Sequence, residues 1–369
     1  MFVELHTSSA FSFLDAASLP ETLVERAAAL GYPALALLDR DGVYGMPRFH
    51  KAARAAGLKA IVGAELSIQG PATWDRGPDV EVSHSQVFVP GGSPRRSLAT
   101  ASSAESDTRV TGPGSRVAFD RGWPESGHSQ VSVLGGTRVP GPGSQIPGLW
   151  RLPVLVETRE GYQNLCRLVT RMHLRAPKGE GALTLGDLDG QTAGLIAIVG
   201  REALAASRHG VGGLVDRLVG LFGREQVYLE LQRHFLRDEE TDNAMLRDLA
   251  AAFHVPLMVS NGVRFAEPAE RPLFDVLTCI RHRTTLSGAG RRLARNAERY
   301  LKPPAEMAGL FRDDPGAVAA TVALAERIQY TMTDLGYRFP EYPVPHGETP
   351  ISFLRAVTMV GARERYRPL

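Results

Sequence analysis

The chain is poor in cysteine: among its 369 residues only Cys166 and Cys279 occur, far apart and not in a C-x-x-C arrangement. This pattern excludes a disulfide framework and a zinc ribbon, and it favours a reducing compartment such as the cytoplasm. No apolar run reaches the about 18 residues that a membrane span needs. The first residues include Glu4 and His6 where a secretory signal would be basic and then apolar, so we expect neither export nor membrane insertion.

An excess of one charge is also missing. The chain carries 42 Lys and Arg residues against 40 Asp and Glu residues, a formal net charge of +2. This balance gives no general argument for nucleic-acid binding, so any such argument must come from local clusters. Hydrophobic residues make up 43% of the chain. At this length, that is enough for a barrel-sized domain plus part of another.

The first 69 residues alternate between strand-like and helix-like stretches. The strand FVEL precedes a helical pattern from Ser18 to Gly31, with a capping serine, a proline in the first turn and a terminal glycine. Strand-like stretches at 34–38 and 60–62 flank a helical stretch at 46–56. This spacing is typical of βαβ units around a parallel sheet. The alternation resumes at 151–270, and residues 271–369 are mainly helical in pattern.

Residues 70–150 interrupt the alternation. They are rich in Gly, Pro, Ser and Thr and repeat themselves, with HSQV at His84 and again at His128. Such a composition cannot bury enough apolar surface to fold, which predicts a disordered low-complexity insertion. A stretch translated from non-coding or frame-shifted sequence is the alternative.

Three motifs carry a resemblance to a known family: ELH at the first strand end, ALALLDRDGVYG around the second strand and IVGAEL in the third. They resemble the PHP domain, and the ordered chain resembles the N-terminal part of the alpha subunit of C-family bacterial DNA polymerase III, in its error-prone branch. The resemblance implies an α/β fold, a distorted (β/α)7 PHP barrel in two parts (1–69 and 151–270), followed by the truncated beginning of the polymerase palm at 271–369. Further runs support it: LPVLVETREGYQNLCRL, ELQRHFLRDEE, RPLFDVLTCIRH, ERYLKPPAEMAGLF and LGYRFPEYPVP.

Active members of the family hold a metal cluster where strand ends converge. By the resemblance, His6, Asp15 and Glu65 match metal ligands. Other ligand positions are changed: they hold Ser8, Arg40, Arg151, Gly262 and Arg264. Arginine stays protonated and offers no lone pair to a cation. We therefore predict at best a vestigial metal site, with His6 in a structural, hydrogen-bonded role, and expect no cofactor for this chain.

The identity of the new residues suggests a physical role. We hypothesise that Arg40, Arg151 and Arg264 replace the lost cation charge and form ion pairs with Asp15, Asp39 and Glu65, so that Arg40→Met would destabilise the fold. The alternative is that these arginines simply point to solvent.

A second cluster is basic. IRHRTTLSGAGRRLARNAERYLK, from Ile280 to Lys302, contains one acid among many cations. The candidates for phosphate contacts are Arg291, Arg292, Arg295 and Lys302. A solvated surface with no partner is the alternative.

The P-D-x-D-x-D motif with which C-family polymerases hold two Mg²⁺ ions does not occur in the 369 residues. We therefore expect no catalytic residue and no nucleotide addition by this chain alone. For the full-length polymerase, the resemblance implies Mg²⁺, DNA and replication or translesion proteins as partners, and damage-tolerant DNA synthesis. Two alternatives remain: a metal-dependent PHP phosphoesterase or 3′–5′ exonuclease, and a non-catalytic scaffold for the polymerase and its partners.

Overall fold

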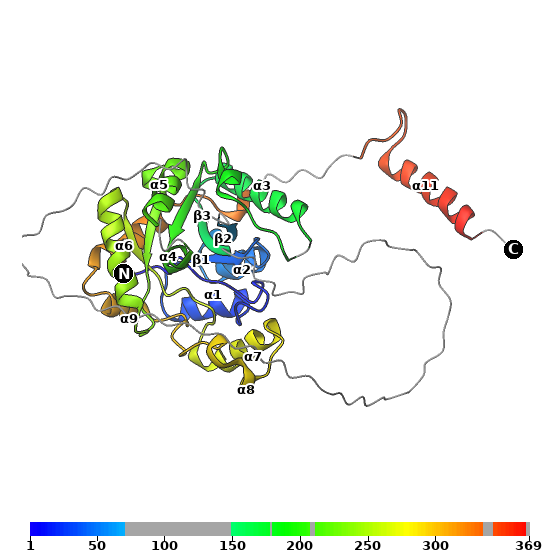
Figure 1. The fold of residues 1–369 in the computed structure, drawn as a ribbon. Coiled ribbons are helices and arrows are strands. Elements are labelled where there is room, and N and C mark those ends of the chain that lie inside the picture. The colour runs from blue at the N-terminus through cyan, green and yellow to red at the C-terminus, as the bar shows by residue number, and fades with distance from the viewer. Residues whose placement is uncertain (71–148, 178, 207–210, 335–341, 367–369) are drawn as a thin grey trace, which may run out of the picture. The chain divides into compact units, whose positions relative to one another are not determined.

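The computed structural model describes residues 1–70, 149–177, 179–206, 211–334 and 342–366. The predicted insertion at 70–150 therefore lies almost entirely outside the described residues. The described residues up to 334 form one α/β unit around a curled sheet (Figure 1). Among the helices in these described ranges, none combines the length and the hydropathy of a membrane span.

Six strands of the described chain form the sheet, in sequence order. They are β1 (Ala34–Arg40), β2 (Lys59–Gln69), β3 (Leu149–Val156), β4 (Leu195–Val199), β5 (Val227–Leu231) and β6 (Leu257–Val259). β1 is parallel to β2, and β4, β5 and β6 are mutually parallel, but β3 is antiparallel to both of its neighbours. The predicted α/β class is confirmed, while the expectation of a parallel sheet is corrected at β3. The register explains this direction, because Leu149 pairs with Gln69, so β3 starts beside the end of β2 and runs back along it.

The N-terminal stretch, predicted as a strand, joins the two edges of this sheet. Glu4 forms a bridge with Leu35 of β1, and Thr7 forms one with Val263 beyond β6. Backbone hydrogen bonds accompany both bridges: Ala36 donates to Glu4, and Val263 donates to His6. Only isolated bridges form here, but the segment occupies the place of a closing strand.

The helices follow the sequence expectations, except that Ser18 does not cap the first one: α1 is preceded by Leu19 without a side-chain cap, and the Ser18 hydroxyl donates to Glu270 instead. In the described ranges the α-helices are α1 (Pro20–Ala29), α2 (Met46–Ala55), α3 (Arg159–Arg175), α4 (Arg201–Ala206), α5 (Val211–Phe222), α6 (Glu239–Phe253), α7 (Arg271–Arg281), α8 (Leu286–Ala289), α9 (Pro304–Leu310), α10 (Pro315–Arg327) and α11 (Pro350–Arg365). Short 3₁₀ turns are η1 (Leu185–Leu188), η2 (Arg224–Gln226), η3 (Pro268–Glu270), η4 (Gly290–Arg292) and η5 (Met332–Asp334).

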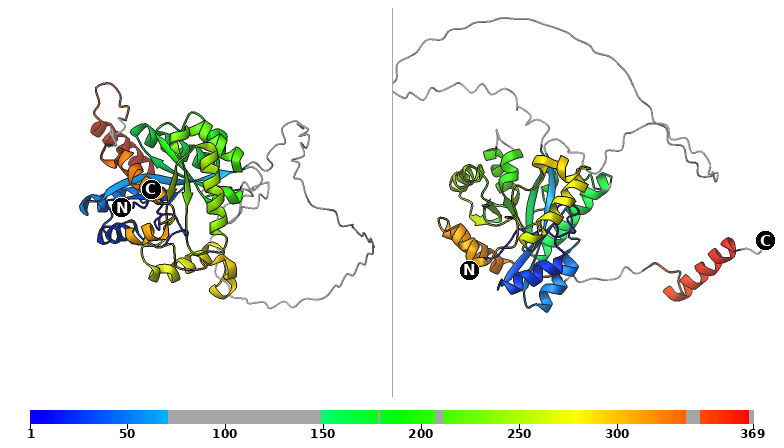
Figure 2. Two further views of the ribbon diagram at one scale, coloured as in Figure 1. Left: turned by 90° about the vertical axis from the view of Figure 1, so that its left-hand side faces the viewer. Right: turned by 90° about the horizontal axis from the view of Figure 1, so that it is seen from below.

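Each face of the sheet carries its own core. Successive strand residues point to opposite faces, so Leu35 and Leu37 of β1 join the larger core, to which α1, α2, α3, α5 and α6 contribute. Ala36 and Leu38 of the same strand join a smaller core that contains Leu324 of α10. Figure 2 shows the helices around the sheet from two further sides.

The segment after β6 is tied to the sheet unit. Phe265 bridges Tyr300, the Tyr32 hydroxyl donates to the Lys302 carbonyl, and the Lys59 ammonium donates to the Ala325 carbonyl. The segment from β6 to residue 334 therefore packs on the sheet and its helices. The assignment of 271–369 to the start of a palm stays a prediction.

Candidate functional site

Strand alternation gathers polar side chains on the face of the smaller core. Along β2, Glu65 has the same parity as Ile61, and along β5, Glu230 has the same parity as Tyr228. Arg40 at the end of β1 shares its parity with Leu38 by the same rule. On this face of the sheet, the earlier positions of these strands hold apolar side chains and the later positions hold charged ones.

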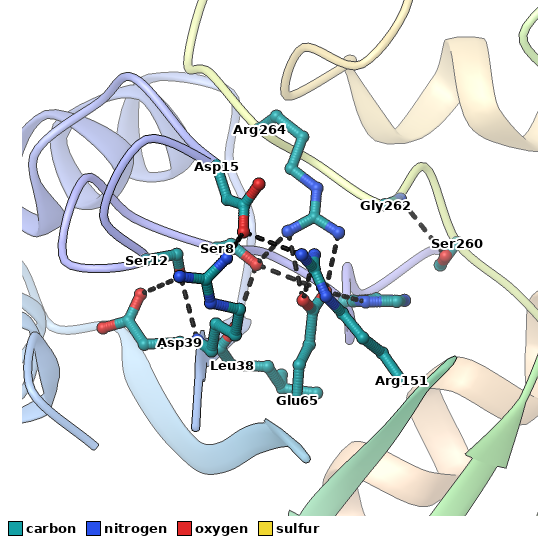
Figure 3. A network of polar contacts seen from close by, with 12 residues as sticks. Ser8, Ser12, Asp15, Leu38, Asp39, Glu65, Arg151, Ser260, Gly262 and Arg264 are labelled. Carbon is teal, nitrogen blue, oxygen red and sulfur yellow. Dashed lines mark hydrogen bonds and ion pairs between the residues drawn. The ribbon is translucent and has the colours of Figure 1, made fainter. Parts of the chain in front are cut away.

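Glu65 is the centre of the gathered side chains and is only 1% exposed. Its Oε1 lies 2.8 Å from an Arg264 guanidinium nitrogen and 2.7 Å from His6 Nε2. Its Oε2 accepts from Arg151 and from Arg264, each at 3.3 Å (Figure 3). Both oxygens are therefore already occupied by cationic donors.

Asp15 is the second buried acid and is surrounded by three arginines. Arg40 and Arg151 both contact Oδ2, the latter at 2.7 Å, and Arg281 of α7 contacts Oδ1. Arg151 thus links Asp15 to Glu65. The name arginine–carboxylate cluster is used below for six residues: Asp15, Arg40, Glu65, Arg151, Arg264 and Arg281.

His6 lies between two carboxylates. Nε2 contacts Glu65, and Nδ1 lies 2.6 Å from Oε1 of Glu230, which also accepts from Ser260 at 2.5 Å. Burial alone would lower the pKa of His6, but the two carboxylates raise it to about 10, so the ring is a cation at neutral pH. The nearby Glu4 accepts from two backbone N–H groups, but burial outweighs them and raises its pKa to about 8.

The cluster also fixes the charge of its acids. Burial would raise the pKa of Glu65, but Arg264, His6 and Arg151 outweigh burial and hold that pKa well below its usual range. Glu65 is therefore ionised throughout the physiological range, and its negative charge is balanced by protein cations.

The remaining predicted positions have structural partners. The Ser8 hydroxyl donates to the Leu38 carbonyl at 2.9 Å and accepts from Arg264 at 2.8 Å. Gly262 has a positive φ of 52°, and a Cβ there would come within 2.8 Å of the Gln232 amide. A ligand side chain at Gly262 would therefore displace Gln232.

Asp39 departs from the hypothesis that it pairs with an arginine. It accepts from the backbone and the hydroxyl of Ser9, at 2.9 and 2.8 Å, and from the backbone of Gly45 at 2.9 Å. Its carboxylate therefore orders the turn after the first strand-like segment and takes no part in the cluster.

The donor chemistry does not fit a multi-metal centre. The carboxylate oxygens of the cluster face guanidinium N–H groups, which are positively charged and have no lone pair to offer a metal ion. Both ring nitrogens of His6 contact carboxylates, so neither is free to bind a metal ion. Within the described parts of the chain, no group of three or more His, Cys, Asp or Glu side chains is placed to hold a metal ion.

The predicted nucleic-acid contacts separate into two kinds. Arg291, Arg292 and Arg295 are exposed, on or just after η4. Lys302 differs from the prediction: its side chain is 1% exposed and its ammonium is 2.8 Å from Glu298 and 4.1 Å from the centre of the Tyr300 ring. Burial and this ion pair leave Lys302 unavailable to a phosphate, so we omit it from the proposed contacts.

Sequence reasoning missed two members of the site. The sequence places Arg281 in the basic run, whereas helix α7 brings its side chain onto Asp15. Glu230 stands in QVYLELQ, where the only signal was an acid in an otherwise apolar strand that is buried throughout. A buried acid in such a strand needs a partner, and this requirement could have pointed to Glu230.

Fold and site define a class: an α/β barrel domain whose charged groups gather on one face, where strand ends meet. The PHP domain family profile matches residues 4–234, and the chain belongs to this family. An error-prone DNA polymerase from Nocardia farcinica is 33% identical over 385 residues, covering 100% of this chain and 30% of its own length. One from Anaeromyxobacter dehalogenans (strain 2CP-1) is 34% identical over 93% of this chain and 24% of its own length.

The chain therefore spans about 30% of the length of the first of these curated relatives. A solved amidohydrolase from Chromobacterium violaceum is similar over 70% of this chain and 86% of its own, with 15% identity. Its TM-score of 0.34 is too low to bear on the fold.

Proposed function

We propose that this chain is the PHP-containing region of an error-prone DNA polymerase, and that its PHP barrel acts as a folded support rather than as a hydrolase. The relatives that match the whole chain carry that name. The supporting role of the barrel rests on one observation: Arg264 and Arg151 contact Glu65, and Arg40 contacts Asp15. Nucleotide addition to DNA, with Mg²⁺ and replication or translesion partners, belongs to the longer protein.

The charges of the arginine–carboxylate cluster explain how it can stabilise the folded barrel. Several acids buried together repel one another unless cations stand between them. Here the cations are guanidinium groups, which also hold their acids through paired, directional hydrogen bonds. The barrel can then stay folded without divalent ions. An arginine can stabilise negative charge, but it can neither hold a divalent ion nor take a proton from water, so we assign no catalytic residue.

The decisive assay for this proposal is hydrolysis by the purified 369-residue chain. With Mn²⁺, Zn²⁺ or Mg²⁺ added, we expect no release of nucleotides from primed DNA and no cleavage of bis-p-nitrophenyl phosphate above the buffer rate. Elemental analysis should find far less than one divalent ion per chain. Stoichiometric metal together with cleavage that disappears in Glu65→Gln would instead support the metal-dependent phosphoesterase or exonuclease.

A second expected result concerns the exposed arginines of η4. If they contact DNA phosphates, the double change Arg291→Gln/Arg292→Gln should weaken binding of primed DNA and reduce the slope of log K against log salt by about 2. Fluorescence anisotropy with the full chain measures both quantities.

The matched control is Arg217→Gln/Arg224→Gln, which removes two exposed arginines from α5 and η2. Equal affinities and slopes for the two double variants would favour the alternative that the basic run is a solvated surface.

A further inference from the structure

Helix α11 carries an exposed apolar face. Leu354, Val357 and Val360 are 66%, 52% and 55% exposed, and none of the residues Pro350–Arg365 is buried. At about 100° per residue, these three side chains lie on the side of the helix opposite Arg355. A helix of 16 residues is only marginally stable alone in water, because most helical stability in proteins comes from packing an apolar face. We therefore expect α11 to pack on a surface that covers this face.

The last residues of the α/β unit lie against the start of α3. The Tyr330 ring stacks on that of Tyr162 in the first turn of α3, with ring centroids 5.1 Å apart, and the Tyr330 backbone donates to the Glu157 carbonyl at 3.1 Å. Further along the chain, the Tyr342 ring stacks on Phe353 of α11, with centroids 6.0 Å apart. The chain between the two stacks is therefore the tether that joins α11 to the start of α3.

This tether limits where α11 can pack. Residues 331–341 separate the two stacked tyrosines, and even a fully extended chain of this length spans no more than about 40 Å. Helix α3 has 17 residues and is about 25 Å long, so every part of α3 is within reach of α11. Since both helices belong to one chain, the effective concentration of α11 beside α3 is in about the millimolar range.

Helix α3 has a hollowed surface that begins at the tyrosine stack. Cys166, Thr170 and Leu174 follow Tyr162 at steps of four residues, so the four side chains form one row that winds slowly around the helix. Leu174 is 83% exposed. A hollow of about 510 Å³, called the α3 hollow below, lies along this row, and its lining residues are Cys166, Arg167, Thr170, Arg171, Leu174 and Arg175.

The arginines of the α3 hollow have partners of their own. Arg171 and Arg175 lie 3.7 and 2.6 Å from Asp187, and Arg167 donates to Asn164 at 2.9 Å. Their charged ends are thus occupied, and their aliphatic stems line the hollow. The hollow therefore presents mainly carbon atoms, which suits the apolar face of a helix.

We propose that α11 packs along the α3 hollow of the same chain, with Leu354 and Val357 against Thr170 and Leu174. This contact continues the tyrosine stack that already joins the end of the α/β unit to α3. It removes apolar surface of both helices from water and so stabilises α11. The contact needs neither DNA nor a metal ion, so it goes beyond the proposed function.

Hydrogen–deuterium exchange of the full chain, read by mass spectrometry, tests the contact. We expect the amides of α11 to be protected, and Leu174→Asp on α3 to speed their exchange at least about tenfold. Leu174 is 83% exposed, so this variant should fold. The matched control is Leu286→Asp, which changes a 53% exposed leucine of α8 and should leave the exchange of α11 as it is.

The thiol of Cys166 gives the reciprocal measurement, because it lies in the α3 hollow. Leu354→Asp should uncover this thiol and raise its rate of alkylation by iodoacetamide at least about tenfold. Arg355→Asp, on the opposite side of α11, should leave the rate as it is.

Exchange of α11 at the rate of an unstructured peptide, or equal exchange in Leu174→Asp and Leu286→Asp, would overturn the proposal. Protection that disappears on dilution would also overturn it, since a second copy of the chain would then cover the face. Metal-dependent hydrolysis found separately would contradict the proposed function while leaving this contact intact.

Discussion

Arg264→Met is expected to lower the free energy of unfolding by about 3–5 kcal/mol, the usual cost of removing one partner from a buried ion pair. Arg264 is buried and bonds both oxygens of Glu65, so its loss leaves that acid with less cationic compensation inside the barrel. Urea unfolding of the unchanged and substituted chains measures the difference. Arg40→Met should cost less, because the Arg40 side chain is 30% exposed and Asp15 keeps Arg151 and Arg281.

Two further variants make this result specific to the ion pair. Arg217→Met removes an exposed arginine and should change the unfolding free energy by less than about 0.5 kcal/mol. Adding Glu65→Gln to Arg264→Met should cost less than the sum of the two single changes, since the unpaired acid is then gone. Additive effects, or an Arg264→Met variant as stable as the unchanged chain, would show that the Arg264–Glu65 ion pair does not stabilise the folded chain.

Stability should fall as the pH rises from about 6.5 toward 10. The pKa of His6 is about 10 in the folded chain, whereas an unfolded histidine has its ordinary value near 6.5. Unfolding between these values releases a proton, so the contribution of His6 is complete below about 6.5 and is lost as the pH rises through 10. The slope approaches about 1.4 kcal/mol per pH unit for one proton, and the raised pKa of Glu4 adds to it below pH 8.

Urea unfolding at pH 7, 8 and 9 gives this slope, and NMR titration of the histidine rings assigns it. His6 should remain protonated at pH 8.5, where an ordinary histidine is neutral. A level stability between pH 7 and 9, or a His6 ring that titrates near 6.5, would mean that Glu65 and Glu230 do not hold the proton. His50→Asn, which changes a histidine of α2 outside the cluster, should leave the slope as it is.

The order of helices and strands could be predicted because caps, prolines and apolar runs act locally. The first helix shows this, with Pro20 in its first turn and Gly31 just after its end. The direction of β3 could not be predicted, because it depends on where the chain re-enters beside Gln69. Pairing partners far apart in the chain are set by tertiary structure, which no local pattern encodes.

The candidate site, too, could be predicted from the sequence only in part. The resemblance to the PHP domain pointed to His6, Asp15 and Glu65, and the kind of residue at the changed positions pointed to arginine–acid contacts. Arg281 and Lys302 were beyond this reasoning, because a basic run does not reveal which cation turns inward. Helix α7 directs Arg281 to Asp15, and a contact four residues away ties Lys302 to Glu298.

Arg151 and Arg264 contact the carboxylate of Glu65, the acid that the family resemblance implies as a metal ligand. Anomalous X-ray scattering at the manganese edge, from crystals of the full chain grown with Mn²⁺, shows whether a cation can still bind there. We expect no manganese peak among His6, Asp15 and Glu65, and clear density for Arg151 and Arg264 on the Glu65 carboxylate. An ordered manganese ion bonded to Glu65 and His6, with the arginines turned away, would show that the arginines do not replace the metal.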